Sequence, residues 1–199
     1  MKLNVWRNAA RFVGFACGML VAASVACAKS DTRTRDSQQS ASTPPSTVTP
    51  EASTVTPQGY GAIHIGASAV QLADAVGSKI PPSHSPDERA CRYVMLAALP
   101  SGMRVMLVND SVARIDITAA GPRTADGIGI GDTEARLVST YGARASVRPN
   151  KYMGPVGHDV VVNAPTDSTH RLIFETDGRK VVRFRAGRQP AVDLVEGCG

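Results

Sequence analysis

Two similar stretches decide the fold, Ile63-His-Ile-Gly-Ala-Ser-Ala-Val-Gln-Leu-Ala-Asp-Ala-Val-Gly77 and Ile128-Gly-Ile-Gly-Asp-Thr-Glu-Ala-Arg-Leu-Val-Ser-Thr-Tyr-Gly142. They align without a gap. In each, alternating isoleucines lead to a glycine, and Ser68 or Thr133 follows as an expected N-cap hydroxyl. A short helix with apolar periodicity comes next and stops at a glycine, the usual residue beyond a helix C-terminus. The stretch therefore predicts a strand and a short helix at the start of each of two repeats.

Strand-like segments separated by turn residues follow each predicted helix. After the first helix come 91–96, 104–108 and 112–117, and after the second come 158–162, 171–175 and 180–185. Asp177-Gly178 is a strong signal for a type I′ hairpin turn. Strict alternation puts one set of side chains on a covered face, namely Ile115, Ile117, Val182 and Phe184. The opposite face then carries Arg114, Asp116, Arg183 and Arg185.

These patterns predict an α+β fold with two tandem repeats, each a short helix packed on an antiparallel sheet. The repeats span about 61–118 and 126–186 within a domain at 59–199. The motif of Ile-Gly-x-Ser/Thr, a two-turn helix, strands and a hairpin resembles BamE/SmpA-type lipoproteins and β-lactamase-inhibitor-protein-like repeats. The first resemblance implies an outer-membrane assembly accessory, and the second implies an exported inhibitor that binds through a concave sheet. Both imply a protein partner, and neither carries over a functional residue.

The N-terminus reads as an export signal over residues 1–26. Basic residues Lys2, Arg7 and Arg11 precede an uncharged run from Phe12 to Ala28, which is the order of a secretory signal. Ser24-Val25-Ala26 before Cys27 resembles the lipobox of bacterial lipoproteins, which implies a lipid on Cys27. The alternative is cleavage after Ala28, which would release a soluble periplasmic or secreted protein that begins at Lys29.

Residues 27–58 combine the candidate anchor with a Ser-, Thr- and Pro-rich segment in which Ser-Thr-Val-Thr-Pro occurs twice. Such a composition predicts a disordered linker, because it has little apolar surface to bury. A lipidated Cys27 would tether the domain to the periplasmic side of the outer membrane. The membrane is therefore one expected partner.

Charge and cysteine content narrow the remaining possibilities. The formal net charge is +5, but the three basic residues of the signal leave without any acid, so the remainder carries only +2. This value and the export signal argue against nucleic acid as a partner. Of the four cysteines only Cys91 and Cys198 belong to the mature domain, so a disulfide between them is expected in an oxidising compartment.

Few residues indicate chemistry. Gly127-Ile-Gly-Ile-Gly131 has the wrong spacing for a dinucleotide loop and is interpreted as a strand lead-in. The four histidines show no metal-ligand spacing, and the chain has no G-x-S-x-G. Convergence of Asp110, Asp116 and Asp132 in the fold stays open, as does proximity of His64 and His158. No catalytic residue, metal or cofactor is predicted.

The densest charge feature is basic and comprises Arg179, Lys180, Arg183, Arg185 and Arg188. Its strand pattern makes Arg183 and Arg185 a candidate binding face, and the alternative is a solvated strand face. The leading hypothesis is a non-enzymatic envelope lipoprotein that acts as a protein-binding or structural module, with a protein partner of unknown identity. The first alternative is a ligand-binding module for glycan or anion, and the second is a hydrolase whose site assembles only in the fold.

Overall fold

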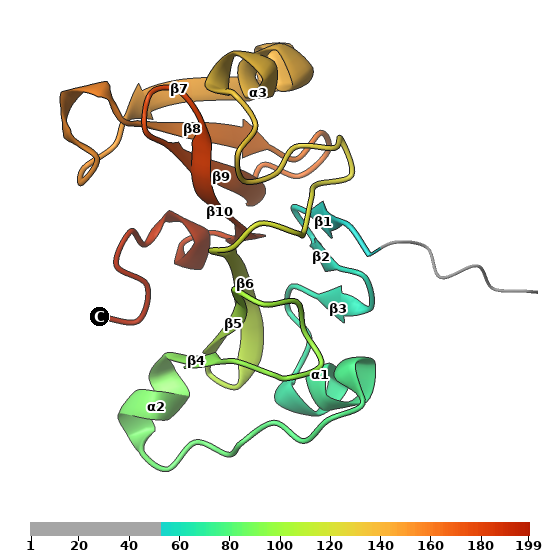
Figure 1. Cartoon of the computed structure of the whole chain (residues 1–199). Coiled ribbons are helices and arrows are strands. Elements are labelled where there is room, and N and C mark those ends of the chain that lie inside the picture. The colour runs from blue at the N-terminus through green and yellow to red at the C-terminus, as the bar shows by residue number, and fades with distance from the viewer. Residues whose placement is uncertain (1–52) are drawn as a thin grey trace, which may run out of the picture. The chain divides into compact units, whose positions relative to one another are not determined.

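The computed structural model describes residues 53–199, which form a mixed α and β fold with few short helices and two antiparallel sheets (Figure 1). The predicted α+β class is therefore confirmed at this level. The signal, Cys27 and most of the predicted linker lie outside the described residues. The helices are α1 (Ala69–Val76), α2 (Pro86–Ala90) and α3 (Glu134–Tyr141).

A seven-stranded sheet forms the centre of the domain. Its spatial order is β4-β5-β6-β10-β9-β8-β7, so the last strand in sequence lies beside β6 in the middle. Six of its strands occur close to where the sequence predicts them, whereas β7 and helix α2 were not anticipated. The strands are β4 (Arg92–Val94), β5 (Met103–Val108), β6 (Ser111–Ile117), β7 (Ala145–Pro149), β8 (His158–Asn163), β9 (His170–Thr176) and β10 (Val181–Arg188).

A small three-stranded sheet lies on one side of the large one. It consists of β1 (Val55–Thr56), β2 (Gly59–Tyr60) and β3 (Ile63–His64). The first strand of the described residues therefore starts at Val55, within the segment that the sequence predicts as linker. Val55 is fully buried and also forms a parallel bridge with Thr124. The composition around Val55 gives no strand pattern, because the strand is held by distant residues: the Val55 N–H donates to the Arg123 carbonyl at 2.9 Å.

The two predicted helix starts are confirmed. Ser68 forms a capping box with Gln71: its Oγ accepts from the backbone N–H, and the Gln71 carboxamide accepts from the Ser68 N–H at 2.8 Å. Thr133 accepts from the backbone N–H of Arg136 at 3.2 Å. Gly77 ends α1 in the left-handed conformation (φ 61°), which glycine adopts without a Cβ clash.

Each helix is joined to the large sheet by the same kind of backbone hydrogen bond. The Gly66 N–H donates to the Val112 carbonyl of β6 at 2.6 Å, and the Gly131 N–H donates to the Val181 carbonyl of β10 at 2.9 Å. The predicted strand at 128–130 is present only as an isolated bridge between Arg123 and Gly129, unlike β3 in the first copy. The helices α1 and α3 lie at opposite ends of the domain in Figure 1.

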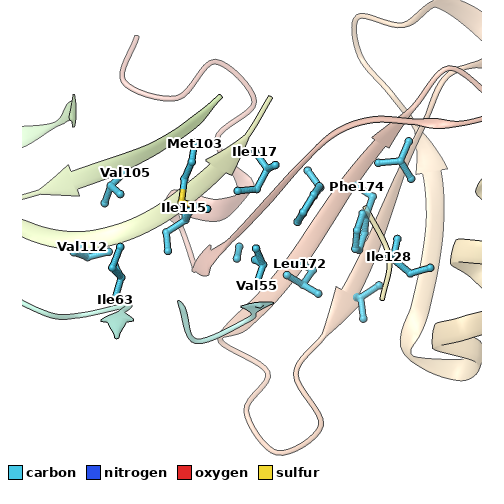
Figure 2. Close-up of a cluster of buried hydrophobic side chains, with 14 of the residues drawn as sticks. Val55, Ile63, Met103, Val105, Val112, Ile115, Ile117, Ile128, Leu172 and Phe174 are labelled. Carbon is cyan, nitrogen blue, oxygen red and sulfur yellow. The ribbon is translucent and has the colours of Figure 1, made fainter. Parts of the chain in front are cut away.

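The main core fills the space between the large sheet, the two longer helices and the small sheet (Figure 2). Ile115, Ile117 and Phe184 are buried as predicted. Val182 is only half-buried, and Val181 takes its place, because a bulge between Val181 and Arg183 shifts the register. The stacked rings of Phe174 and Phe184, whose centroids lie 5.2 Å apart, belong to this inner face.

The opposite, outer face of the large sheet is covered in part by residues 189–198, here called the C-terminal strap. Figure 1 shows this segment on the other side of the sheet from β1–β3. It contains a short 3-10 turn, Ala191–Asp193, whose Val192 packs on Val161 and Ile173 in a second small core. The outer face was expected to be exposed, and the strap explains why Arg114, Asp116 and Arg185 are instead buried.

Candidate functional site

Opposite charges are paired across β5, β6, β10 and β9 on the outer face, whereas Asp159 of β8 lies opposite a like charge, Glu175 of β9. Arg104 of β5 and Arg185 of β10 both lie opposite Asp116 of β6. One row further along, Arg183 of β10 lies opposite Glu175 of β9. Opposite charges on directly paired residues stabilise a sheet. The side chains predicted to point away from the core therefore form a ladder of ion pairs.

Glu175 is the centre of this ladder and is almost fully buried. Its carboxylate accepts from Arg183 Nε at 2.6 Å and from Arg185 Nη1 at 2.5 Å. Burial lowers the pKa of Arg185, and the positive charge of Arg114 lowers it further, whereas Glu175 opposes both effects. Glu175 is thus the largest of the negative charges that compensate the buried guanidinium, ahead of Asp159 and Asp116.

The C-terminal strap is held to the outer face by buried arginines. Arg185 Nε donates to the carbonyl of Val192 at 2.7 Å, and Arg114 Nη1 donates to the carbonyls of Ala191 and Leu194. Arg114 also donates through Nε to Asp116 at 2.9 Å. The two arginines therefore satisfy strap carbonyls and sheet carboxylates at the same time, which fixes the strap without regular secondary structure.

A disulfide closes the end of the strap. Cys91 and Cys198 are bonded with an S–S distance of 2.07 Å across 107 residues of sequence, as cysteine parity predicted. Gly197 sits against the ring of Tyr93, where a Cβ would come within 2.5 Å of the hydroxyl oxygen. This close approach and the φ of 75° both favour glycine at position 197, where the strap lies against Tyr93 of β4.

A small hollow remains between the ladder and the strap, here called the arginine hollow. It offers about 20 Å³, room for one water-sized group. Two of its side chains, Arg104 and Arg183, are roughly half exposed, whereas Asp116 and Arg185 are buried. Its lining comprises Arg104, Arg114, Asp116, Ile117, Thr118, Glu175, Arg183, Phe184, Arg185 and Val195.

Several polar atoms at the arginine hollow lack a hydrogen-bond partner within residues 53–199. They are Arg185 Nη2, Arg104 Nε and Asp116 Oδ2. The last two lie 4.0 Å apart, too far for a direct hydrogen bond. Buried polar atoms are rarely left unsatisfied in folded proteins. The arrangement therefore offers both donors and an acceptor to one small group.

The predicted binding face is thus divided by the structure. Arg183 keeps about half of its side chain exposed, but Arg185 is only 2% exposed and reaches solvent at most through the hollow. The alternation of the strand residues predicted correctly that both arginines lie on the outer face. It could not predict that the C-terminal strap covers Arg185. The candidate lipidation residue, Cys27, lies outside the described part of the chain.

The other candidate residues do not assemble into one site. Asp110 pairs with Arg92, Asp116 with Arg114, and Asp132 with Arg123 and Arg136. His64 stays exposed on β3. No cluster of metal-ligating residues is present among residues 53–199.

His158 has one carboxylate neighbour, Glu134, at the start of α3. Its Nδ1 lies 2.9 Å from Glu134 Oε1, and Thr176 donates its hydroxyl to the same carboxylate. This contact joins α3 to strands β8 and β9. It holds the start of α3 against the sheet. It contains a single carboxylate, that of Glu134, and so does not form a pair of carboxylates.

An exposed apolar loop connects β4 to β5. Its sequence is Met95-Leu-Ala-Ala-Leu-Pro100, which had been predicted in part as strand. Met95 is 82% exposed, and all six residues keep some exposure. Shallow grooves of about 400 and 470 Å³ flank this apolar loop and share Leu99 and Pro100. Sequence reasoning missed the loop because its apolar run reads as a strand end.

No helix in the described residues is long and apolar enough to cross a membrane. Comparison of the chain with models of protein families, with curated proteins and with solved structures finds no match.

Proposed function

We propose that this protein is a non-enzymatic envelope lipoprotein whose domain binds another protein. In this proposal residues 1–26 direct export, and a lipid on Cys27 anchors the chain at the periplasmic side of the outer membrane. The Cys91–Cys198 disulfide supports the exported compartment, because disulfides persist where the surroundings are oxidising. The lipobox-like residues before Cys27 support the anchor.

The observation that carries a protein partner is the apolar loop. Soluble domains seldom place six consecutive apolar residues in a connection between strands, because loops run over the surface. Here Met95 is 82% exposed and grooves lie on both sides of Leu99 and Pro100. An apolar partner surface that covers this loop would remove it from water. Each Å² of apolar surface buried in this way would stabilise the complex by about 25 cal/mol.

Site-specific crosslinking tests the partner. A photoreactive amino acid at Met95, in the full chain expressed in intact cells, should yield one discrete crosslinked species. The matched control carries the same group at Ser139, an exposed position on α3, and should yield none. Equal labelling from both positions, or none from either, would contradict a partner at the apolar loop.

Intact-mass analysis of the mature protein tests the anchor. We expect acyl mass on Cys27 as the first residue. A mature protein that starts at a free Lys29 would end the lipoprotein proposal and leave the soluble alternative, without changing the assignment of the apolar loop.

We further propose that the domain consists of two tandem repeats, about 61–118 and 126–186. Support comes from the equivalent backbone bonds of Gly66 and Gly131, which have φ of 94° and 93°. The next equivalent pair also agrees, since the Ala69 N–H donates to Asp110 and the Glu134 N–H donates to Arg179 at 2.8 and 2.9 Å.

Matched substitutions test the repeats. Gly66→Ala and Gly131→Ala both place a Cβ at a positive φ with no atom nearby. Each should therefore lower the free energy of unfolding by the backbone strain alone, about 1–3 kcal/mol. Similar losses in denaturant unfolding are expected, and a large loss at one glycine only would argue against equivalent roles.

A further inference from the structure

The arginine hollow combines an excess of positive charge with unsatisfied buried atoms. Of its charged lining residues, four are arginines and two are acids, Asp116 and Glu175. Glu175 is already bonded to Arg183 and Arg185, and Arg114 is bonded to Asp116 and to the strap. The atoms at the hollow that lack a partner within residues 53–199 are two donors, Arg104 Nε and Arg185 Nη2, and one acceptor, Asp116 Oδ2. Arg183 contacts Glu175 through Nε and Nη2 and is half exposed.

The small volume of the hollow limits how much of a ligand it can contain. With about 20 Å³ of room, it admits a single oxygen atom, and both Arg185 and Asp116 line it. The rest of a ligand would lie outside, beside the half-exposed guanidiniums of Arg104 and Arg183. Guanidinium groups bind oxyanions well, because their N–H donors match the spacing of two oxygens.

The buried acceptor selects among oxyanions. An oxygen in the hollow must accept from Arg185 and donate to Asp116, so it must carry a proton. Carboxylate and sulfate carry none near neutral pH and would bring a bare oxygen against Asp116. A phosphate monoanion has both kinds of oxygen, one protonated and the others free to accept from Arg104 and Arg183.

We propose that the arginine hollow is a binding site for a phosphate monoanion, either free phosphate or the phosphomonoester of a lipid headgroup. The protonated oxygen donates to Asp116 Oδ2 and accepts from Arg185 Nη2. Two deprotonated oxygens face Arg104 and Arg183. The strap forms one wall through Val195, so the site exists only with the strap in place. The hollow shares Arg104 and Thr118 with one groove beside the apolar loop, but the inference is argued from its charged side chains and does not depend on the proposed protein partner.

Calorimetric titration of the mature chain with inorganic phosphate, and separately with sulfate, tests the site. Phosphate should bind, and sulfate should bind about tenfold more weakly, because it cannot donate the hydrogen bond to Asp116. Arg104→Gln and Arg183→Gln should each weaken phosphate binding about tenfold. The matched control is Arg188→Gln, which removes an exposed arginine of β10 outside the hollow and should bind as the wild type does.

Asp116 supplies the sharpest readout. Asp116→Asn should abolish the preference for phosphate over sulfate, provided that circular dichroism shows it folded; if it is not, the Arg104→Gln variant decides. The wild-type protein should also bind a phosphomonoester more tightly at about pH 5.5 than at about pH 7.5, since the second pKa of such esters is about 6. Charged or titratable groups of the packed strands also lie at or beside the hollow and contribute to any pH dependence. They are Tyr93, Arg104, Arg114, Asp116, Glu175, Arg183 and Arg185.

A second arm separates the two sources of phosphate. Phosphatidylcholine vesicles that contain phosphatidic acid should retain the protein in a flotation assay if the ligand is a lipid headgroup, and Arg183→Gln should release it. Binding of inorganic phosphate without vesicle retention would assign the site to free phosphate. The proposal is overturned if neither probe binds, if sulfate binds as tightly as phosphate, or if the Arg183→Gln variant binds like the Arg188→Gln control.

Discussion

The two faces of the large sheet are held together by opposite means. On the inner face Ile115, Phe174 and Phe184 pack into one apolar core. On the outer face the same strands present a ladder of charges that is buried by the C-terminal strap. Apolar burial is non-directional and tolerates small shifts, whereas a buried ion pair depends on every partner. The comparison indicates that the inner face supplies most of the stability and the outer face fixes one arrangement of the strap.

The largest expected effect is on the inner face. Phe174→Ala removes a fully buried ring that stacks on Phe184 and should lower the free energy of unfolding by about 4 kcal/mol. Denaturant unfolding measures this loss. A loss no greater than that of a surface substitution would mean that the core lies elsewhere.

The outer face should respond almost as strongly to the loss of one charge. Glu175→Gln leaves the buried Arg185 without its main counter-charge and should cost about 3 kcal/mol in the same unfolding measurement. The exposed Arg188→Gln is the control and should change stability by less than about 0.5 kcal/mol.

A double replacement sharpens the contrast between the faces. Replacing Glu175 by Leu and Arg185 by Met together removes both charges, so it should cost less than Glu175→Gln alone. If the double variant is instead the less stable one, the ladder stabilises the fold directly and the comparison drawn above fails.

Local signals allowed much of the inner side to be predicted from sequence. Ser68 and Thr133 mark their helix starts through bonds to residues three positions away. A hairpin also forms at Asp177-Gly178, where Gly178 has φ of 84°, but the predicted type I′ turn is wrong, because Asp177 does not have the positive φ that such a turn needs. Such features need no knowledge of distant contacts.

The outer side could not be predicted in the same way. Alternation placed Arg183 and Arg185 on the correct face but gave no sign of a cover, because the strap has no periodic pattern of its own. Its position depends on contacts such as Arg114 with Leu194, separated by 80 residues. The bulge that exchanges Val182 for Val181 is equally non-local, since it arises from strand pairing.

Removal of a helix cap on the inner side should lower the free energy of unfolding less than the substitutions on either face of the sheet. Ser68→Ala and Thr133→Ala each remove an acceptor for a backbone N–H and should cost about 1 kcal/mol in thermal or denaturant unfolding. Ser139→Ala is the control, because its hydroxyl lies mid-helix and donates to the carbonyl of Arg136. A cost for Ser139→Ala equal to that of the caps would contradict a specific capping role.

The smallest effect compares one tyrosine on each face. The pKa of Tyr93 on the outer face and that of Tyr141 on the inner face are both raised to about 12, first by burial. The negative charge of Asp116 adds to the shift of Tyr93, and that of Asp126 adds to the shift of Tyr141. Because both folded values lie above the unfolded value of about 10, the stability that they contribute is complete below pH 10 and is lost as the pH rises toward 12.

Carbon-13 spectra of ring-labelled tyrosine, recorded against pH, can follow each residue separately. Asp116→Asn should lower the pKa of Tyr93 and leave that of Tyr141 unchanged, whereas Asp126→Asn should do the reverse. If Asp116→Asn moves neither titration, the charge of Asp116 does not act on Tyr93, and burial is then the main cause of the raised pKa of Tyr93. If only the pKa of Tyr93 responds, the charge of Asp116 on β6 acts on the Tyr93 hydroxyl on β4 beneath the strap.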